Sequence, residues 1–353
     1  MSLKNPQLHT DENLSYLIHD VFGRPMRDLR ISVIDRCNFR CTYCMPQESF
    51  GEHYSFIEKK NWLTFGEILR LSKLFAHLGV NKIRLTGGEP LLRPDLDNLV
   101  RDLSKLSATN DLALTTNGFF LEENVFSLYK AGLKRLTVSL DTLDQKIFEQ
   151  INGSRGELNK VLRGIQKAKD AGFQNIKINA VIQKGVNDNS IMDLVEYARH
   201  NGHILRFIEY MDVGNCNHWQ SSAVVPSADI LKLIASRYPL LAIKPHYFGE
   251  VAERYRFSDT QGEIGFISSV SQPFCTTCTR LRLSTDGKLY TCLFASESTD
   301  LGTPLRAGAT DQELIDIITG VWKKRTDKYS ENRYLFTDLK IKTPKVEMFQ
   351  IGG

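Results

Sequence analysis

This sequence of 353 residues lacks any long apolar run. No stretch approaches the roughly 18 apolar residues that a membrane-spanning helix needs. The first twenty residues also lack an apolar secretory segment, because charged side chains interrupt them at Lys4, Asp11, Glu12 and Asp20. We therefore expect a cytoplasmic protein with no membrane partner.

The chain also has little net charge. Its 45 Lys and Arg residues exceed its 41 Asp and Glu residues by only a formal +4. Nucleic-acid binding by bulk electrostatics usually requires a strongly basic face, so we expect no nucleic-acid partner and only local anion binding. The proportions of hydrophobic (42%) and charged (24%) residues exclude a disordered or fibrous chain.

Cysteines are few and odd in number, which argues against a disulfide framework in a chain that is not exported. Six of the seven form two groups of three, which favours metal or redox chemistry. The first triplet is Cys37, Cys41 and Cys44; the second triplet is Cys275, Cys278 and Cys292. We leave the remaining cysteine, Cys216, outside any site, because a lone free cysteine is most often a small buried hydrophobe.

Strand-like runs alternate with helical patterns over the first two thirds of the chain. The predicted strands span residues 29–34, 82–86, 112–116, 134–140, 175–182 and 204–210. Thr64 and Glu67 form a predicted helix-capping box, and glycines at 79, 132, 172 and 202 stand where helices should stop. Such repeated βα units predict an α/β fold, with parallel strands whose working residues gather at the strands' C-terminal ends.

The pattern changes after a predicted helix at 226–237. Paired strands are expected at 250–258 and 262–268, and a hairpin at 280–294 that turns at Asp286-Gly287. A last helix is expected at about 311–324, before a basic, irregular tail. We place a soft boundary near residue 245, between an N-terminal extension plus barrel (1–245) and a C-terminal α+β region (246–353).

The first triplet, Cys37-x3-Cys41-x2-Cys44, directly follows the first predicted strand. Three thiolates on one loop could bind three irons of a [4Fe–4S] cluster and leave the fourth iron open to a ligand. A zinc knuckle is the alternative, but the loop offers no fourth ligand at the usual zinc spacing, and the nearest histidine is His53.

This loop resembles the signature of the radical S-adenosylmethionine superfamily, whose fold is a partial (β/α)6 TIM-like barrel. Gly87-Gly88-Glu89-Pro90, after the second predicted strand, resembles the superfamily's glycine-rich segment, against which the methionine end of S-adenosylmethionine binds. The resemblance implies a [4Fe–4S] cluster and S-adenosylmethionine as cofactors. It also implies S-adenosylmethionine contacts for Tyr43, Gly88, Ser139 and Met211.

The second triplet, Cys275-x2-Cys278-x13-Cys292, also lacks a fourth ligand nearby; the nearest upstream histidine is His246. A zinc ribbon normally supplies two CxxC pairs. The spacing resembles the second [4Fe–4S] cluster of the GTP 3′,8-cyclases, which act in the first step of molybdenum cofactor biosynthesis. The resemblance runs from about Asp20 to Gly353, and the segment RISVIDRCNFRCTYCM at 30–45 also matches closely.

Two arginines, Arg280 and Arg282, follow the CxxC pair of the second triplet. On a strand they share one face while Leu281 packs on the other. By resemblance the GTP-binding residues are Arg30, Arg84, Thr115, Lys177, Arg280 and Arg282, with the choice between Thr115 and Thr116 left open. The resemblance also gives catalytic roles to Arg280, Arg282 and the terminal pair Gly352-Gly353, which reaches into the active site; without a Cβ, glycine suits a narrow channel.

The resemblance implies a lyase reaction in which an adenosyl radical removes hydrogen from C3′ of GTP and the carbon radical attacks C8. A low-potential donor such as a flavodoxin would supply electrons, and a cyclic pyranopterin monophosphate synthase would take the product. A homodimer is also expected. The alternatives are a peptide-modifying radical S-adenosylmethionine maturase, which typically needs more than three auxiliary cysteines, and a zinc-stabilised nucleic-acid-binding protein. The cyclase hypothesis requires both triplets to face one enclosed interior.

Overall fold

The computed structural model describes residues 17–107, 111–259, 262–338 and 344–353. Lys4, Asp11 and Glu12 lie outside this part. One sheet of twelve strands runs through it, in the order β12-β11-β10-β1-β2-β3-β4-β5-β6-β9-β8-β7. The strands are β1 (Asp28–Ser32), β2 (Lys82–Thr86), β3 (Asp111–Thr116), β4 (Arg135–Ser139), β5 (Lys177–Ile182), β6 (Ile204–Glu209), β7 (Leu240–Ile243), β8 (Glu253–Phe257), β9 (Glu263–Ile267), β10 (Arg280–Leu283), β11 (Lys288–Tyr290) and β12 (Thr299–Asp300).

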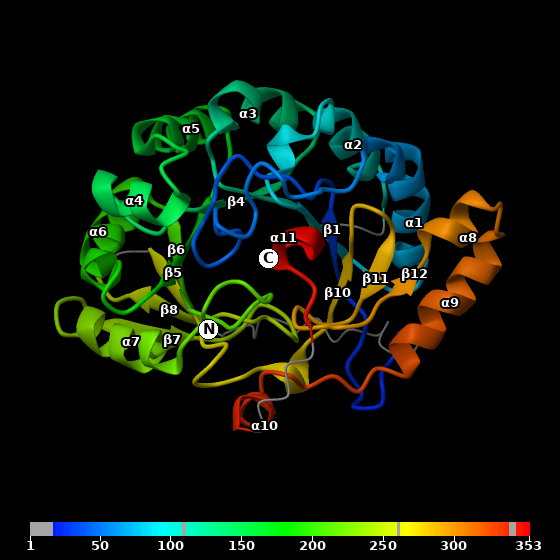
Figure 1. Cartoon of the computed structure of the whole chain (residues 1–353). Helices are drawn as coiled ribbons and strands as arrows, with labels where there is room; N and C mark the ends of the chain where they lie inside the picture. The colour runs from blue at the N-terminus through cyan, green and yellow to red at the C-terminus, as the bar shows by residue number, and fades with distance from the viewer. Residues whose placement is uncertain (1–16, 108–110, 260–261, 339–343) are drawn as a thin grey trace, which may run out of the picture.

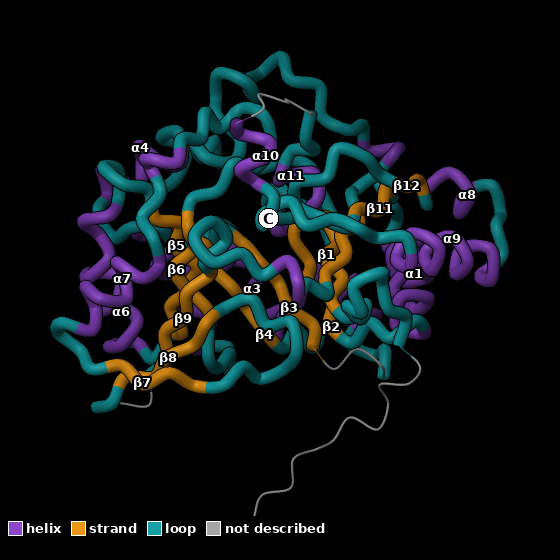
Figure 2. Tube along the Cα trace, turned by 90° about the horizontal axis from the view of Figure 1, so that it is seen from below, coloured by secondary structure: helices purple, strands orange, loops and turns teal. Residues whose placement is uncertain are grey.

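Most of the helices cover the outside of the sheet, whereas the last one lies inside the arc that they form (Figure 1). The helices are α1 (Phe65–His77), α2 (Leu96–Leu103), α3 (Leu121–Lys130), α4 (Gln145–Asn152), α5 (Leu158–Asp170), α6 (Ile191–Asn201), α7 (Ser227–Ala235), α8 (Gly302–Arg306), α9 (Asp311–Lys323), α10 (Arg333–Asp338) and α11 (Met348–Ile351). Figure 1 shows an outer arc of helices around the strands, with α11 and the C-terminus inside it. In Figure 2, α4, α6 and α7 flank the strands on one side, and α1, α8 and α9 on the other. No helix in the described ranges is both long and apolar enough to cross a bilayer.

The centre of the sheet is parallel and forms a partial TIM-like barrel, as predicted. Strands β1 to β6 are consecutive parallel neighbours, and β10 and β9 extend this set by pairing in parallel with β1 and β6. The remaining strands pair antiparallel at the two ends of the row. Because the row is linear in the described chain, with β12 and β7 at its ends, the barrel is open.

Alternation along each parallel strand separates the core from the interior of the barrel. On β1, the buried Leu29 and Ile31 join the hydrophobic core, whereas Arg30 between them points into the barrel cavity. Strand β10 repeats the pattern, with Leu281 in the core and Arg280 and Arg282 at the cavity. The predicted opposite orientation of Leu281 and its flanking arginines is therefore confirmed.

Local signals predicted the boundaries of the longer elements well. The capping box of α1 is present, with the Thr64 side chain accepting from the Glu67 amide and the Glu67 side chain accepting from the Thr64 amide. The helices α1, α3, α5 and α6 each end within two residues of a predicted stop glycine. The hairpin of β10 and β11 is also as predicted.

The tail after α9 differs from the prediction of an irregular segment. It contains α10 and the four-residue helix α11. Such a short helix is marginal by itself and depends on tertiary packing, here of the buried Phe349 against Met45 and Phe50. Strand β7 and helix α8 were not predicted either. The boundary near residue 245 stays a prediction; the sheet itself runs continuously from one region into the other.

Candidate active site

A cavity of about 290 Å³ occupies the inside of the open barrel. All six cysteines of the two triplets line it, so the triplets share one interior. The other predicted site residues that line it are Tyr43, Gly88, Ser139, Met211, Arg30, Arg84, Thr115, Lys177, Arg280, Arg282 and Gly353. Gly352 does not line the cavity but contacts Arg282, which does.

The two triplets lie at opposite ends of the parallel strands. The first triplet follows β1 and lies at its C-terminal end. Cys275 and Cys278 instead precede β10, whose first residue Arg280 pairs with Asp28 at the start of β1. Cys292 follows the antiparallel strand β11 and returns to the same end. Our expectation that all working residues gather at the C-terminal strand ends is therefore wrong for the second triplet, because its cysteines flank a hairpin that enters the sheet from the other side.

The glycine-rich segment packs directly on the backbone that leads into the first triplet. The Gly88 amide donates to the Ile34 carbonyl at 2.8 Å, and the Glu89 amide to the Arg36 carbonyl at 2.8 Å. A Cβ added to Gly87 or Gly88 would lie 2.2 Å from one of these carbonyl oxygens. Only glycine permits this approach, so the segment is fixed against the cysteine loop.

Two buried carboxylates organise the strand ends beside the first triplet. Glu89 accepts from the Thr116 hydroxyl at 2.7 Å and from the Asn117 amide at 2.8 Å, and burial raises its pKa to about 7. Asp141 accepts from the Tyr43 hydroxyl at 2.7 Å, and burial raises its pKa to about 6. Sequence reasoning named Glu89 only as part of the glycine-rich segment, with no role for its carboxylate, and missed Asp141, although each follows a predicted strand by only a few residues.

The donor set of the first triplet, three thiols on one loop at the cavity wall, fits a bound iron-sulfur cluster. Burial raises the pKa of Cys37 to about 12, and the charge of Glu89 adds to this shift. Burial also holds the pKa values of Cys41 and Cys44 well above the usual range, with a further contribution from the neighbouring thiols. These thiols ionise when iron binds them, since metal binding releases the proton. No three His, Cys, Asp or Glu side chains within the described ranges are arranged for a single metal ion; in a [4Fe–4S] cluster each thiolate binds a different iron.

Around the second triplet, arginines compensate the charge of the thiolates. Burial would raise the pKa of Cys278, but the charges of Arg280 and Arg325 outweigh it and bring this pKa down to about 6. The Arg280 Nε donates to the Cys278 Sγ at 3.3 Å. For Cys292, burial dominates and raises the pKa to about 11. The residues present therefore fit a thiolate-bound cluster at this end of the cavity.

Cationic side chains line the cavity between the triplets. Burial lowers the pKa of Arg30 well below its usual range, and the positive charges of Arg282, Arg280 and Arg84 lower it further. For Lys177 the same causes, burial first and then Arg206 and other cations, lower the pKa to about 6. This charge is therefore poorly compensated by the protein, and a bound polyanion would relieve it.

The structure brings Thr115 rather than Thr116 to these cations. The Arg84 Nη1 donates to the Thr115 hydroxyl at 2.8 Å, whereas the Thr116 hydroxyl donates to Glu89. This orientation supports Thr115 as the substrate residue.

Arg206 of β6 is a cavity residue that sequence reasoning missed. Its Nε donates to Asn179 Oδ1 at 3.0 Å, and burial together with Arg84 and Arg135 lowers its pKa to about 9. A charged residue in the middle of a mostly apolar strand is a signal that could have found it, whereas Arg30 and Arg84 were predicted by the family resemblance.

The C-terminal tail enters the cavity at the position of Arg282, whose guanidinium donates to the Gly352 carbonyl. Phe349 fixes the tail from the other side, packing edge-on against Phe50 with ring centroids 5.0 Å apart. Gly352 has φ +72°, and a Cβ there would lie 2.0 Å from Thr86 Cγ2. The predicted entry of the terminal glycines into the site is thus consistent with the backbone found here.

Comparisons with known proteins agree with this site. Residues 31–198 match the family described as "Radical SAM superfamily", and residues 203–331 match the family described as "Molybdenum Cofactor Synthesis C". A GTP 3′,8-cyclase of Acidothermus cellulolyticus is 52% identical over 325 residues, covering 91% of this chain and 90% of that protein. A GTP 3′,8-cyclase of Xanthomonas axonopodis pv. citri is 49% identical over 336 residues, covering 95% and 99%.

A solved structure shares the fold at low sequence identity. The crystal structure of Streptococcus suis SuiB bound to S-adenosylmethionine is 17% identical, with a TM-score of 0.59, over 90% of this chain and 71% of that one. At this identity the likeness shows a common fold and nothing about the substrate.

Proposed function

The chain belongs to the GTP 3′,8-cyclase family of radical S-adenosylmethionine enzymes, and from that premise we propose how its cavity converts GTP to (8S)-3′,8-cyclo-7,8-dihydroguanosine 5′-triphosphate. This reaction is the first step of molybdenum cofactor biosynthesis. The observation that carries the proposal is that both cysteine triplets and the cationic residues between them line one cavity.

The first triplet would hold the [4Fe–4S] cluster that the superfamily uses. When bound, this cluster supplies the electron that cleaves S-adenosylmethionine and yields the 5′-deoxyadenosyl radical. Tyr43, Gly88, Ser139 and Met211, all at the cavity wall, would position S-adenosylmethionine. A site inside the barrel would limit the access of water to a reactive intermediate and so suppress side reactions.

The second triplet would hold a second [4Fe–4S] cluster at the other end of the cavity. GTP would lie between the two, with its triphosphate on the cationic residues Arg30, Arg84, Lys177, Arg280 and Arg282 and near Thr115. The fixed charges of the arginines in such a buried site bind phosphates strongly and need no reorganisation. Gly352 and Gly353 would complete the site beside Arg282. A homodimer, a cytoplasmic location, a flavodoxin-like donor and transfer to a cyclic pyranopterin monophosphate synthase stay predictions.

The activity is tested by reconstituting the protein anaerobically with iron and sulfide, then reducing it in the presence of S-adenosylmethionine and GTP. We expect 5′-deoxyadenosine and the cyclised nucleotide in equal amounts by mass spectrometry. Uptake of zinc without a reducible cluster, or 5′-deoxyadenosine without a cyclised nucleotide, would overturn the proposal. The second result would revive the peptide-modifying alternative.

The second cluster is tested by the substitution Cys292→Ser. The wild-type chain should take up about eight irons and the variant about four, since each cluster holds four irons. Cys216→Ser is the matched control, because Cys216 belongs to neither triplet and should leave the iron content unchanged. Equal iron content in Cys292→Ser and wild type would contradict a cluster at the second triplet.

A further inference from the structure

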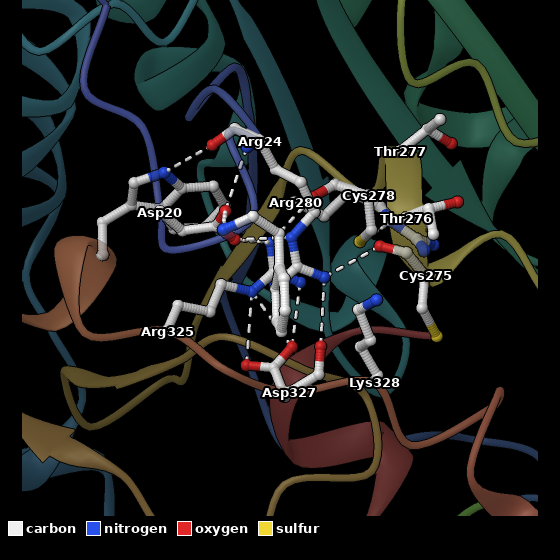
Figure 3. Close-up of polar contacts among 12 residues, drawn as sticks. Asp20, Arg24, Cys275, Thr276, Thr277, Cys278, Arg280, Arg325, Asp327 and Lys328 are labelled. Atoms are coloured by element: carbon white, nitrogen blue, oxygen red, sulfur yellow. Dashed lines mark hydrogen bonds and ion pairs between the residues drawn. The ribbon is translucent and has the colours of Figure 1, made fainter.

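A group of buried charged residues lies beside the second triplet, and two of them, Arg24 and Arg325, also line the cavity. Asp20 and Arg24 precede β1, and Arg325 follows α9, so the group joins the segment before β1 to the segment after α9. Figure 3 shows these side chains around the cysteine pair. The three side chains are between 0% and 1% exposed. None of the three was predicted as a site residue.

Each of the two arginines donates to the backbone of one cysteine of the CxxC pair. The Arg24 Nη1 donates to the Cys275 carbonyl at 2.8 Å, and the Arg325 Nη1 donates to the Cys278 carbonyl at 2.7 Å. These carbonyls mark the two ends of the short 3₁₀ turn that carries the cysteines. The turn has its own hydrogen bond, from the Cys278 amide to the Cys275 carbonyl at 3.2 Å. Because the hydrogen-bond geometry of a 3₁₀ turn is poor, the two guanidiniums add support at both of its ends.

Asp20 connects the two arginines. Its Oδ2 is 2.5 Å from the Arg24 Nε and 3.7 Å from the Arg325 Nη1. Asp327 adds a second link, because its carboxylate pairs with Arg325 at 2.9 Å and its carbonyl accepts from Arg24 at 3.0 Å. The positions of the two guanidiniums, and hence of the two cysteine carbonyls, are thereby fixed relative to one another.

A simpler explanation of these contacts is that they only hold the segment before β1 against the segment after α9. Trp322 already provides such a link, since its indole Nε1 donates to the Arg24 carbonyl at 3.0 Å. Holding these two segments together does not require a guanidinium on each cysteine carbonyl. The planar fork of arginine, with several donors at fixed angles, suits this task, and lysine cannot reproduce it.

We propose that Asp20, Arg24 and Arg325, named here the Asp20 clamp, are positioning residues that set the spacing of Cys275 and Cys278 for iron-sulfur binding. This inference rests on the proposed cluster at the second triplet. The clamp touches neither the first triplet nor the glycine-rich segment in the contacts of the described residues, so its loss should affect one cluster selectively.

The test uses Arg24→Lys and Arg325→Lys, which keep the charge and lose the fork, and Asp20→Asn as a further variant that keeps the size of the side chain. After anaerobic reconstitution, iron and sulfide are measured per chain, and electron paramagnetic resonance spectra of the reduced proteins are recorded with S-adenosylmethionine or GTP added separately. Each variant should hold about four irons where wild type holds about eight. It should keep the spectral response to S-adenosylmethionine and lose the response to GTP.

Arg199→Lys is the matched control. Arg199 of α6 pairs with Asp259 through two hydrogen bonds and lies over an aromatic ring, as Arg24 does, but lies on the outer surface of the barrel. This variant should keep wild-type iron content and both spectral responses.

Clamp variants with about eight irons and a normal GTP response would overturn the proposal. Variants that lose both clusters equally, or that fail to fold while Arg199→Lys folds, would also overturn it, because the clamp would then support the whole fold and not one cluster. A wild-type chain that takes up only about four irons would instead overturn the second cluster itself. The failure of the clamp and the failure of the proposed function are thus separate results.

Discussion

Lys177 is the residue whose charge depends most directly on what fills the cavity. Its ammonium group is buried among cations, and its pKa of about 6 leaves it mostly neutral at pH 8 when no anion is bound. A triphosphate beside it would favour the charged form and raise the pKa. Binding of GTP should therefore take up a proton.

We expect GTP binding at pH 8 to take up close to one proton at Lys177, and the affinity to fall by up to about tenfold per pH unit as the pH rises above 6. Below pH 6 the lysine is charged before binding, so its contribution to the pH dependence disappears. Calorimetric titration in buffers of different ionisation enthalpy measures the proton uptake. Lys177→Met should remove it, and an identical proton count in the variant and wild type would contradict the assignment.

Individual site residues could be predicted where the family resemblance covers them. Arg30 and Arg84 were predicted in this way, by resemblance to the GTP 3′,8-cyclases. Arg24 and Arg325 were not, because their partners are backbone carbonyls about 250 and 47 residues away in the sequence. No local pattern encodes such a contact.

At the scale of elements, the terminal helix α11 delivers Gly352 to a place where no side chain fits. Both the positive φ and the close Thr86 methyl require glycine there. The helix itself is fixed by Phe349 in its aromatic surroundings.

Gly352→Ala should displace the tail from the cavity and lower cyclised-nucleotide formation by at least about tenfold, or roughly 1.4 kcal/mol. Hydrogen exchange of residues 344–353, followed by mass spectrometry, should rise. Gly308→Ala is the control, because Gly308 also has positive φ but a Cβ there meets nothing within 4 Å. Adding Thr86→Ala should partly restore tail protection; no change in exchange in Gly352→Ala would show that the tail tolerates a side chain.

The elements predicted from local periodicity were the long ones. Six parallel strands and their helices were readable because each carries its own alternation and end signals. The pairing of β10 with β1 was not, because the partners are about 250 residues apart. That pairing is what moves the second triplet to the opposite end of the strands from the first.

At the scale of the whole molecule, the parallel sheet depends on strands from both predicted regions. Strand β9 covers the edge of β6, and β10 covers the edge of β1. Removing residues 246–353 would expose both edges of the parallel set at once, and unpaired strand edges promote aggregation.

We therefore expect a chain of residues 1–245 to aggregate or to unfold at least about 10 °C below the full chain, because a loss of a few kcal/mol lowers a domain's melting temperature by about this much. Circular dichroism melting and size-exclusion chromatography measure both outcomes. The full chain should unfold in a single transition. A monomeric, stably folded fragment would support an independent domain with its boundary near residue 245.

The contact between β1 and β10 also orders events during synthesis. A ribosome makes β1 early and β10 late, so the edge of β1 that pairs with β10 stays unpaired until most of the polypeptide has emerged. Arg325 emerges later still, and it holds the loop of Cys278. A cluster at the late cysteines would therefore be delivered after translation, whereas the early cysteine loop and the glycine-rich segment that packs on it are both made while the nascent chain is still short.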